Sequence, residues 1–341
     1  MRVLLTGHQG YLGTVMAPVL AAAGHAVTGL DSGLFADCVL GALDVPDAPG
    51  LAVDLRDVTV EQLAGFDAVV HLAALSNDPL GSLAPEITHD VNHHASTRLA
   101  RLAKEAGVGR FVYASTCSVY GAQPGDELVD EDAPLRPVTP YAESKVRVED
   151  DLVALADDGF VPVSMRNATA FGFSPRLRAD IVLNNLVGHA VLTGTVRVLS
   201  DGTPWRPLVH AVDIAEAVVV ALAAPAEVVR ARAYNVGTER NNRTVAEIAA
   251  AVVDAVAGSE LLVTGETGND PRSYRVDFSR ARKELGFEAR WTIPDGAVEL
   301  AREYRARGLT REAFDRRFTR LAVLRTRQEA GELDATMRPT G

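Results

Sequence analysis

The chain has 341 residues, 47% of them hydrophobic and 23% charged, which is typical of a globular protein long enough to bury a full core and to form two lobes. Its net charge of -11 excludes nucleic acid as a main partner, because binding to a phosphate backbone requires a basic surface. Any anionic ligand must therefore be met by a local group of arginines.

The first 31 residues have the pattern of a strand, a helix and a second strand. Residues 2–7, RVLLTG, are a short apolar run that ends in glycine, which is typical of a buried parallel strand. Residues 8–24 have helical spacing and end at Gly24, a residue suited to a helix C-cap. Residues 25–31 are the second strand, which ends at Asp31.

The same alternation continues to about residue 170. Further strands are expected within 51–57, 66–75, 110–116 and 161–171, and helices within 96–108 and 140–156. Strands that alternate with helices of this length predict right-handed βαβ units and a parallel sheet. We therefore predict an α/β fold, namely a Rossmann-type doubly wound parallel sheet with a smaller, discontinuous α/β lobe for the substrate.

The pattern changes after residue 170, where loops rich in Arg, Pro and Gly begin. One more strand–helix unit follows at 208–224, and the chain from about 238 is rich in helix. We expect a first domain in 1–170 plus 207–236 and a second lobe in 171–206 plus 237–328. Residues 329–341 are expected to be a mobile C-terminal tail.

Glycines at 7, 10 and 13 lie between the first strand and its helix. Gly7 permits a tight turn, Gly10 lets the backbone approach a pyrophosphate, and Gly13 lets the helix pack against the strand. Asp31, at the end of the second strand, is placed to accept hydrogen bonds from a ribose 2′-hydroxyl and to repel a 2′-phosphate. This context predicts NAD as the cofactor and the first domain as the NAD-binding domain. A glycine-rich turn without a ligand would leave Asp31 and Asp54 unexplained.

Residues 140–145, PYAESK, combine a proline that can open a helix with one of only three lysines in the chain. On a helix, Tyr141 and Lys145 are about one turn apart and share a face. A nearby ammonium favours the phenolate and lowers the pKa of a tyrosine toward neutrality. The pair therefore suggests an enzymatic base, although a solvent-exposed pair on a helix is the alternative that spacing alone allows.

Several motifs together resemble one family. They are TGHQGYLG (6–13), HLAAL (71–75), VYASTCSVYG (112–121), YAESK (141–145), NNL (184–186), RPLVHAVD (206–213) and YNVG (234–237). In these segments the chain resembles the extended short-chain dehydrogenases/reductases, and within them the NAD-dependent nucleotide-sugar epimerases and dehydratases. The resemblance extends from residue 1 to about residue 305.

The resemblance implies roles for particular residues. Tyr141 would be the base that removes a proton from a sugar hydroxyl, Lys145 would also hold the nicotinamide ribose, and Thr116 would align the reacting oxygen. The further residues implied along the cofactor are Gln9, Tyr11, Leu12, Asp54, Leu55, Leu72, Ala73, Ala74, Asn92 and Ser115.

The loop after Thr116 bears on the type of reaction. The 4,6-dehydratases of this family carry an Asp-Glu pair directly after the threonine, where this chain has Cys117 and Ser118. An epimerase acting at C4 needs only Thr, Tyr, Lys and NAD, so the sequence favours a nucleotide-sugar 4-epimerase. The alternatives are a net reductase or dehydrogenase, a dehydratase with the same triad, a cysteine acid/base role for Cys117, and a non-catalytic NAD-binding protein.

On the substrate side, the resemblance implies that Arg206 binds the diphosphate and that Asn185 lies nearest to it. By alignment, the second phosphate-binding arginine of the 4-epimerases falls on Thr267, and Arg272 is its expected substitute. The other residues expected near the substrate are Ser76, Cys117, Ser118, Thr169, Asn184 and Leu186. Helices 95–106 and 146–155 are the expected interface of a homodimer.

The sequence lacks the patterns that would indicate a disulfide framework, a metal site or a membrane span. The two cysteines, Cys38 and Cys117, form no CxxC pair, which is typical of a reducing compartment. The chain begins directly in an expected strand, and no uncharged apolar run reaches about 18 residues. We expect a cytoplasmic protein that binds no membrane and no metal.

Overall fold

The computed structural model describes residues 1–340 except 77–83, 123–126 and 267–271. Its centre is a seven-stranded sheet in the order β11-β7-β5-β4-β1-β2-β3, and all neighbouring strands are parallel. The strands are β1 (Arg2–Thr6), β2 (Ala26–Asp31), β3 (Gly50–Ala52), β4 (Ala68–His71), β5 (Arg110–Thr116), β7 (Val161–Asn167) and β11 (Arg232–Val236). This order confirms the predicted Rossmann-type doubly wound fold.

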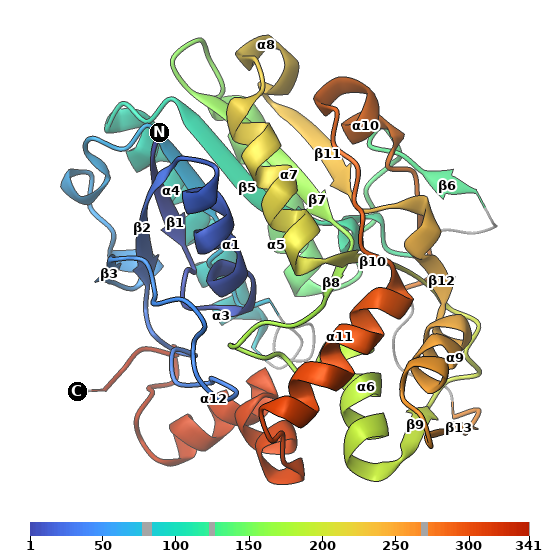
Figure 1. Ribbon diagram of the computed structural model, residues 1–341. Helices are drawn as coiled ribbons and strands as arrows, with labels where there is room; N and C mark the ends of the chain where they lie inside the picture. The colour runs from blue at the N-terminus through green and yellow to red at the C-terminus, as the bar shows by residue number, and fades with distance from the viewer. Residues whose placement is uncertain (77–83, 123–126, 267–271, 341) are drawn as a thin grey trace.

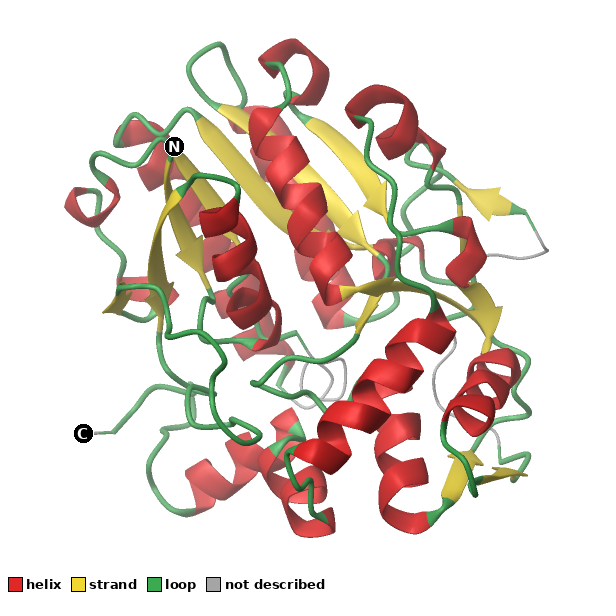
Figure 2. Ribbon diagram, in the orientation of Figure 1, coloured by secondary structure: helices red, strands yellow, loops and turns green. Residues whose placement is uncertain are grey.

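Helices cover both faces of the sheet (Figure 2). On one face, α1 (Tyr11–Ala22) lies beside α7 (Ala211–Ala223), and on the other face α4 (Ala95–Glu105) lies beside α5 (Pro140–Leu155) (Figure 1). Successive residues of β1 face opposite layers, since Leu5 packs with the α1/α7 cluster and Leu4 with the α4/α5 cluster. Burial on both faces explains why these strands read as continuous apolar runs.

Three apolar positions on α4 and α5 bear on the expected homodimer. Leu99, Val148 and Leu152 are all buried within the core of their own subunit, against the sheet. These side chains are therefore used inside the protomer and are not available to a partner subunit. The homodimer stays a prediction that rests on the remaining surface of the two helices.

The second lobe is built around its own core, which consists mainly of residues from α6 (Val182–Thr193), α9 (Val245–Ala255) and α11 (Ile293–Ala306). Its strands are β8 (Thr169–Phe171), β10 (Trp205–His210) and β12 (Asn242–Thr244) in one small sheet, and β9 (Thr195–Val198) with β13 (Glu260–Val263) in another. The remaining short elements are β6 (Leu128–Val129), β14 (Arg275–Val276), α3 (Pro85–His89), α8 (Ala226–Val229) and α10 (Ser279–Leu285).

The chain after α11 folds back against the first domain. We call residues 309–340 the C-terminal arm; it includes a π-helical turn (Ala313–Arg317) and α12 (Arg320–Glu329), drawn in red in Figure 1. Leu324, Leu333 and Met337 pack with Leu75 in one apolar cluster. The arm thus includes residues 329–340, which the sequence suggested to be a mobile tail and which the structure places in contact with the first domain.

Among the described residues, no helix combines the length and the apolar character needed to cross a bilayer.

Candidate active site

A cavity of about 600 Å³ lies at the carboxyl ends of the central strands and is lined by both lobes. In doubly wound folds this edge of the sheet is the usual position of the ligand. Its lining begins at the glycine turn after β1, passes the ends of β2, β4 and β5, and reaches α5 and α6 on the far side.

The glycine turn brings bare backbone to the cavity. Gly7 has a φ of 75°, and a Cβ there would lie 2.9 Å from the backbone nitrogen of Ala73. A Cβ on Gly13 would lie 2.1 Å from the carbonyl oxygen of Gly7, so only glycine allows α1 to approach the strand so closely. Gly10 caps α1 without a side-chain hydrogen bond, which leaves the first N–H groups of the helix for an anion.

Asp31 is held in place at the end of β2. Its carboxylate accepts hydrogen bonds from the backbone N–H of Gln9 at 3.0 Å and of Gly33 at 2.9 Å. These bonds fix one carboxylate beside the glycine turn, where it can meet ribose hydroxyls. Asp54 also lines the cavity, but it caps the 3-10 turn Leu55–Asp57 and is bound to Arg56 at 2.7 Å.

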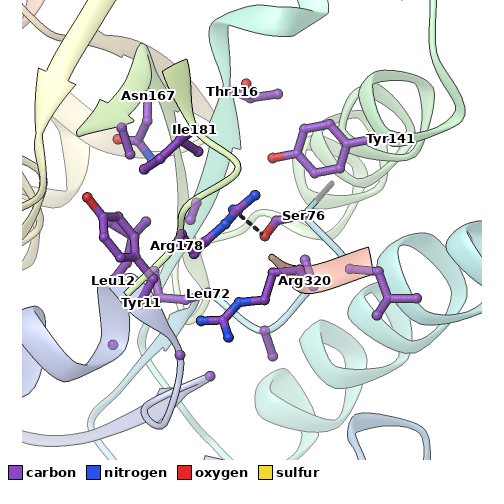
Figure 3. A pocket seen from close by; sticks show the side chains of 18 of the residues that line it. Tyr11, Leu12, Leu72, Ser76, Thr116, Tyr141, Asn167, Arg178, Ile181 and Arg320 are labelled. Carbon is purple, nitrogen blue, oxygen red and sulfur yellow. Dashed lines mark hydrogen bonds between the residues drawn. The ribbon is translucent and has the colours of Figure 1, made fainter. Parts of the chain in front are cut away.

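The helix that carries the predicted base begins where the sequence predicts. The hydroxyl of Thr139 accepts from the backbone N–H of Ala142 at 3.2 Å, and Pro140 occupies the first turn of α5. One turn separates Tyr141 from Lys145, and both line the cavity. Figure 3 shows the hydroxyl end of Tyr141 directed into the space that Thr116 also borders.

Lys145 is a buried ammonium in an aromatic setting. Its Nζ donates to the carbonyl of Ala114 at 2.7 Å and lies 4.6 Å from the ring centroid of Tyr113 and 5.6 Å from that of Tyr141. Burial lowers the pKa of this ammonium to about 7, although the carboxylate of Glu149 acts in the opposite direction. The positive charge of Lys145 can stabilise a Tyr141 phenolate, but near neutral pH the ammonium readily loses its proton.

A buried ion pair supports this end of the site from behind. Glu149, one turn after Lys145 on α5, accepts three hydrogen bonds from Arg166, at 2.7, 3.1 and 3.2 Å, and a further bond from the hydroxyl of Ser115. Both charged side chains are almost fully buried. The ion pair fixes β7 relative to α5, and the bond from Ser115 ties the end of β5 to the same carboxylate.

At the end of β5, the side chains of Thr116 and Ser118 face the cavity, and that of Cys117 does not. Thr116 lines the cavity, and its Oγ1 accepts from the backbone N–H of Ser118 at 3.1 Å. Ser118 also lines the cavity, and its hydroxyl lies 3.3 Å from Nη1 of Arg272. Cys117 faces away, because its Sγ donates to the carbonyl of Arg166 at 3.1 Å, and burial raises the pKa of this thiol.

The opposite end of the cavity carries the two arginines expected for a diphosphate. Arg206 bonds the carbonyl of its neighbour Trp205 at 2.8 Å and also that of Arg272, and both arginines line the cavity. Further lining residues at this end are Ser76, Thr169, Asn185 and Leu186. Thr267, the position of the arginine that the alignment found missing, lies outside the described residues.

Comparison with known proteins agrees with this geometry. A sequence model of the NAD dependent epimerase/dehydratase family matches residues 3–237, which is more than half of the chain. The chain belongs to this family. A UDP-glucose 4-epimerase from Mycolicibacterium smegmatis is 31% identical over 316 residues, which cover 89% of this chain and 99% of the relative. A dTDP-glucose 4,6-dehydratase from Streptomyces niveus is 30% identical over 328 residues, which cover 89% and 93%.

A solved structure extends the similarity to three dimensions. DesIV, a dTDP-glucose 4,6-dehydratase from Streptomyces venezuelae with NAD and TYD bound, has a TM-score of 0.78 and 26% identity, and covers 92% of this chain and 100% of that chain. NAD is the cofactor of the family, and the residues present fit it. The glycine turn leaves no room for side chains. The carboxylate of Asp31 lies beside this turn, where it can accept hydrogen bonds from the hydroxyls of the adenosine ribose.

Three residues that the sequence analysis predicted to lie beside NAD or the substrate do not line the cavity. Asn92 is buried, and its amide bonds the backbone N–H and carbonyl of Leu75 at 2.7 and 3.0 Å. Asn184 is buried and bonds the backbone of Gly172 and the carbonyl of Arg178. Cys117 is the third. Asn92 and Asn184 hold cavity-lining loops, because an asparagine amide can satisfy backbone groups that a turn leaves unpaired.

The family motifs did not point to several residues that do line the cavity. These are Asn167, Arg178, Asp180, Tyr274, Arg320 and Met337. Arg178 forms an ion pair with Asp180 at 2.9 Å and donates to the hydroxyl of Ser76 at 3.1 Å (Figure 3). Asn167 has a buried Oδ1 without a hydrogen-bond partner in the described chain. The sequence pointed to Arg178 only through the arginine-rich loop SPRLRAD. That loop does not indicate that Arg178 pairs with Asp180 or bonds Ser76.

Two histidines near the start of α4, His89 and His93, lie close to carboxylates of α5. His93 bonds Asp151 at 2.9 Å, and His89 lies 3.8 Å from Glu143. Within the described part of the chain, no three His, Cys, Asp or Glu side chains gather as a set of metal ligands.

Proposed function

We propose that this enzyme catalyses the NAD-dependent epimerisation of a nucleoside-diphosphate sugar at C4 of the sugar. The family comprises both epimerases and dehydratases, so the proposal depends on what surrounds the reacting carbon. The observation that carries it is the combination of Thr116, Tyr141 and Lys145 in the cavity with a neighbouring loop that offers no carboxylic acid.

Tyr141 is the proposed base. As a phenolate it removes the proton of the sugar hydroxyl, while Thr116 holds the same oxygen by a hydrogen bond. Lys145 stabilises the phenolate through its charge. The glycine turn and Asp31 would hold NAD, which would supply reversible hydride transfer at the same carbon, so that epimerisation would bring no net oxidation.

The loop after Thr116 argues against loss of water. Elimination needs an acid for the departing hydroxyl and a base for the proton on the neighbouring carbon. Ser118 is bonded to Arg272 and Cys117 faces away from the cavity, so this loop supplies neither group. The carboxylates that line the described cavity are Asp31 and Asp54 at the adenosine end and Asp180, which is paired with Arg178.

Two features support a nucleoside diphosphate as the activating group of the substrate. Arg206 and Arg272 line the same end of the cavity, in a chain whose net charge is negative. Guanidinium groups suit phosphate oxygens because they can donate two parallel hydrogen bonds. The backbone of α6 at Asn185 and Leu186 borders the same space.

The test is a panel of UDP-, dTDP-, GDP-, ADP- and CDP-sugars incubated with enzyme and NAD in heavy water. Epimerisation gives a product of unchanged mass, no lasting change in absorbance at 340 nm, and a new signal for an inverted carbon in the NMR spectrum. A dehydratase would give a product lighter by one water that carries solvent deuterium, and a net oxidoreductase would accumulate or consume NADH. Protein that binds NAD and leaves every sugar nucleotide unchanged would refute the catalytic proposal.

A further inference from the structure

Three arginines follow one another along one side of the cavity, and two of them, Arg176 and Arg320, are buried. Arg176 is bound by both oxygens of Asp47 at 2.6 and 2.7 Å, and Arg178 is paired with Asp180. Arg320, the first residue of α12, differs from both, because it interacts with Asp180 through charge and its Nη1 is buried without a hydrogen-bond partner in the described residues. Its side chain lines the cavity, and the residue is only 5% exposed.

The contacts of Arg320, which include the side chain of Cys38, leave one buried hydrogen-bond donor, Nη1, unused. Cζ lies 4.2 Å from the ring centroid of Phe35, which engages the face of the guanidinium. Nη2 has one long contact, 3.5 Å, to the carbonyl of Arg176, and Nη1 is buried without a partner in the described residues. Stacking does not satisfy the N–H groups in the plane of the guanidinium, and a buried donor without an acceptor is costly. Burial, with repulsion from Arg178, lowers the pKa of Arg320 to about 10.

The arm that carries Arg320 is firmly attached around the NAD site. Phe318 accepts a hydrogen bond from the backbone N–H of Ala179 at 2.9 Å, and Arg327 donates to the carbonyl of Leu34 at 2.8 Å. Near the adenosine end, the carbonyl of Thr336 accepts from Arg56 at 2.9 Å. The position of the guanidinium is thus set by the fold of the arm, independently of a ligand.

We propose that Arg320 binds the pyrophosphate of the dinucleotide from the side opposite the glycine turn. The cavity offers the free N–H groups of α1 on one side, and Figure 3 shows Arg320 extending toward the part bordered by Tyr11, Leu12 and Leu72. A pyrophosphate brings two negative charges and oxygens on both sides, so one helix terminus leaves acceptors for a second donor. The diphosphate of the sugar substrate is the other possible anion, but its proposed arginines, Arg206 and Arg272, lie at the other end.

This chain is longer than the part of it that one of its relatives matches. The Mycolicibacterium relative matches along 99% of its own length yet covers 89% of this chain, so about a tenth of this chain has no counterpart there. The inference depends on NAD as the cofactor and not on the sugar or on the reacting carbon. A loss of NAD affinity on changing Arg320 would stand even if no sugar nucleotide in the panel reacted.

The experiment compares Arg320→Met with Arg325→Met in the full chain, freed of cofactor. Arg325 lies on the same helix and is exposed, so its change removes the same charge without touching the cavity. Calorimetric titrations use NAD, ADP-ribose, adenosine and UDP as probes. For Arg320→Met we expect a loss of roughly 10- to 100-fold in affinity for NAD and ADP-ribose, with adenosine and UDP unchanged. Arg325→Met should bind all four probes like the wild type.

Other outcomes overturn the proposal. Unchanged NAD affinity in Arg320→Met, an equal loss in Arg325→Met, or an equal loss for adenosine would each show that the guanidinium does not meet the pyrophosphate. A loss confined to UDP would assign Arg320 to the substrate. Arg320→Lys guards against misfolding, because it keeps the charge and should retain part of the affinity for NAD with the thermal midpoint of the wild type.

Discussion

The two ends of the cavity are built in different ways. At the cofactor end, the contact surface is mainly backbone: the glycine turn, the first N–H groups of α1 and an aspartate fixed by two backbone N–H groups. At the substrate end, it is mainly side chains from separate loops, such as Arg206, Arg272 and Ser118. A backbone-built site is encoded by residues close together in sequence, whereas a site built from side chains depends on how distant loops meet.

The largest expected effect is that of changing Tyr141, which should lower catalysis and leave NAD binding unchanged. Tyr141→Phe should lower kcat/KM by roughly 10²- to 10⁴-fold, because it removes the proposed base, while the glycine turn keeps its affinity for NAD. Tyr113→Phe is the matched control, since its buried hydroxyl has no partner in the described chain and does not line the cavity. Steady-state kinetics on the reactive sugar nucleotide and an NAD titration give both values. If the two phenylalanine variants were equally active, Tyr141 would not be the base.

The second prediction concerns the buried ammonium that links the two ends. The pKa of Lys145 is about 7 in the folded chain and 10.5 when unperturbed, so between these pH values the folded chain binds fewer protons than the unfolded chain. The contribution of Lys145 to the free energy of unfolding therefore rises with pH across that window, by at most about 1.4 kcal/mol per pH unit. Below pH 7 the full cost of the buried charge is present.

Lys145→Met removes this dependence. Without cofactor, the variant should be stabilised most, relative to the wild type, at pH 6, and its advantage should shrink toward pH 9. Urea unfolding of both proteins at several pH values measures the difference, and the other ionisable groups largely cancel. A difference that did not change between pH 6 and pH 9 would mean that Lys145 keeps its proton throughout.

The smallest expected effects come from a matched pair on α6. Asn184→Ala should lower the free energy of unfolding by about 1–3 kcal/mol, because it removes the partner of the Gly172 backbone N–H and of the Arg178 carbonyl. Asn185→Ala should change stability less and mainly raise KM for the sugar nucleotide, because Asn185 lines the cavity. Thermal unfolding and steady-state kinetics on both variants provide the test. The reverse pattern would mean that the roles of the two asparagines are exchanged.

The comparison also explains what could be predicted from the sequence. The strand, glycine turn, helix and Asp31 lie within 31 residues, so periodicity and spacing were enough to predict that end of the cavity. The start of α5 at Pro140 followed from a local signal too. These elements depend on backbone conformation, which nearby residues largely determine.

The contacts that could not be predicted join distant parts of the chain. Arg320 meets Phe35 and the backbone of Arg176 across 285 and 144 residues, and no local pattern marks such a meeting. Asn184 and Asn185 look alike in the sequence, and only the turn of α6 decides which of them is buried. Residues 329–341 were expected to be a mobile tail, yet Leu333 and Met337 within them join a cluster with Leu75 and Leu324.

The most direct test of the proposed chemistry follows a label on the reacting carbon. A substrate sugar nucleotide deuterated at C4 is incubated with the enzyme and NAD in ordinary water, and the product is examined by NMR and mass spectrometry. If hydride leaves and returns within one active site, the inverted product keeps its deuterium at C4 and its full mass. Deuterium lost to the solvent, deuterium accumulating in reduced cofactor, or a product lighter by one water would contradict epimerisation at that carbon.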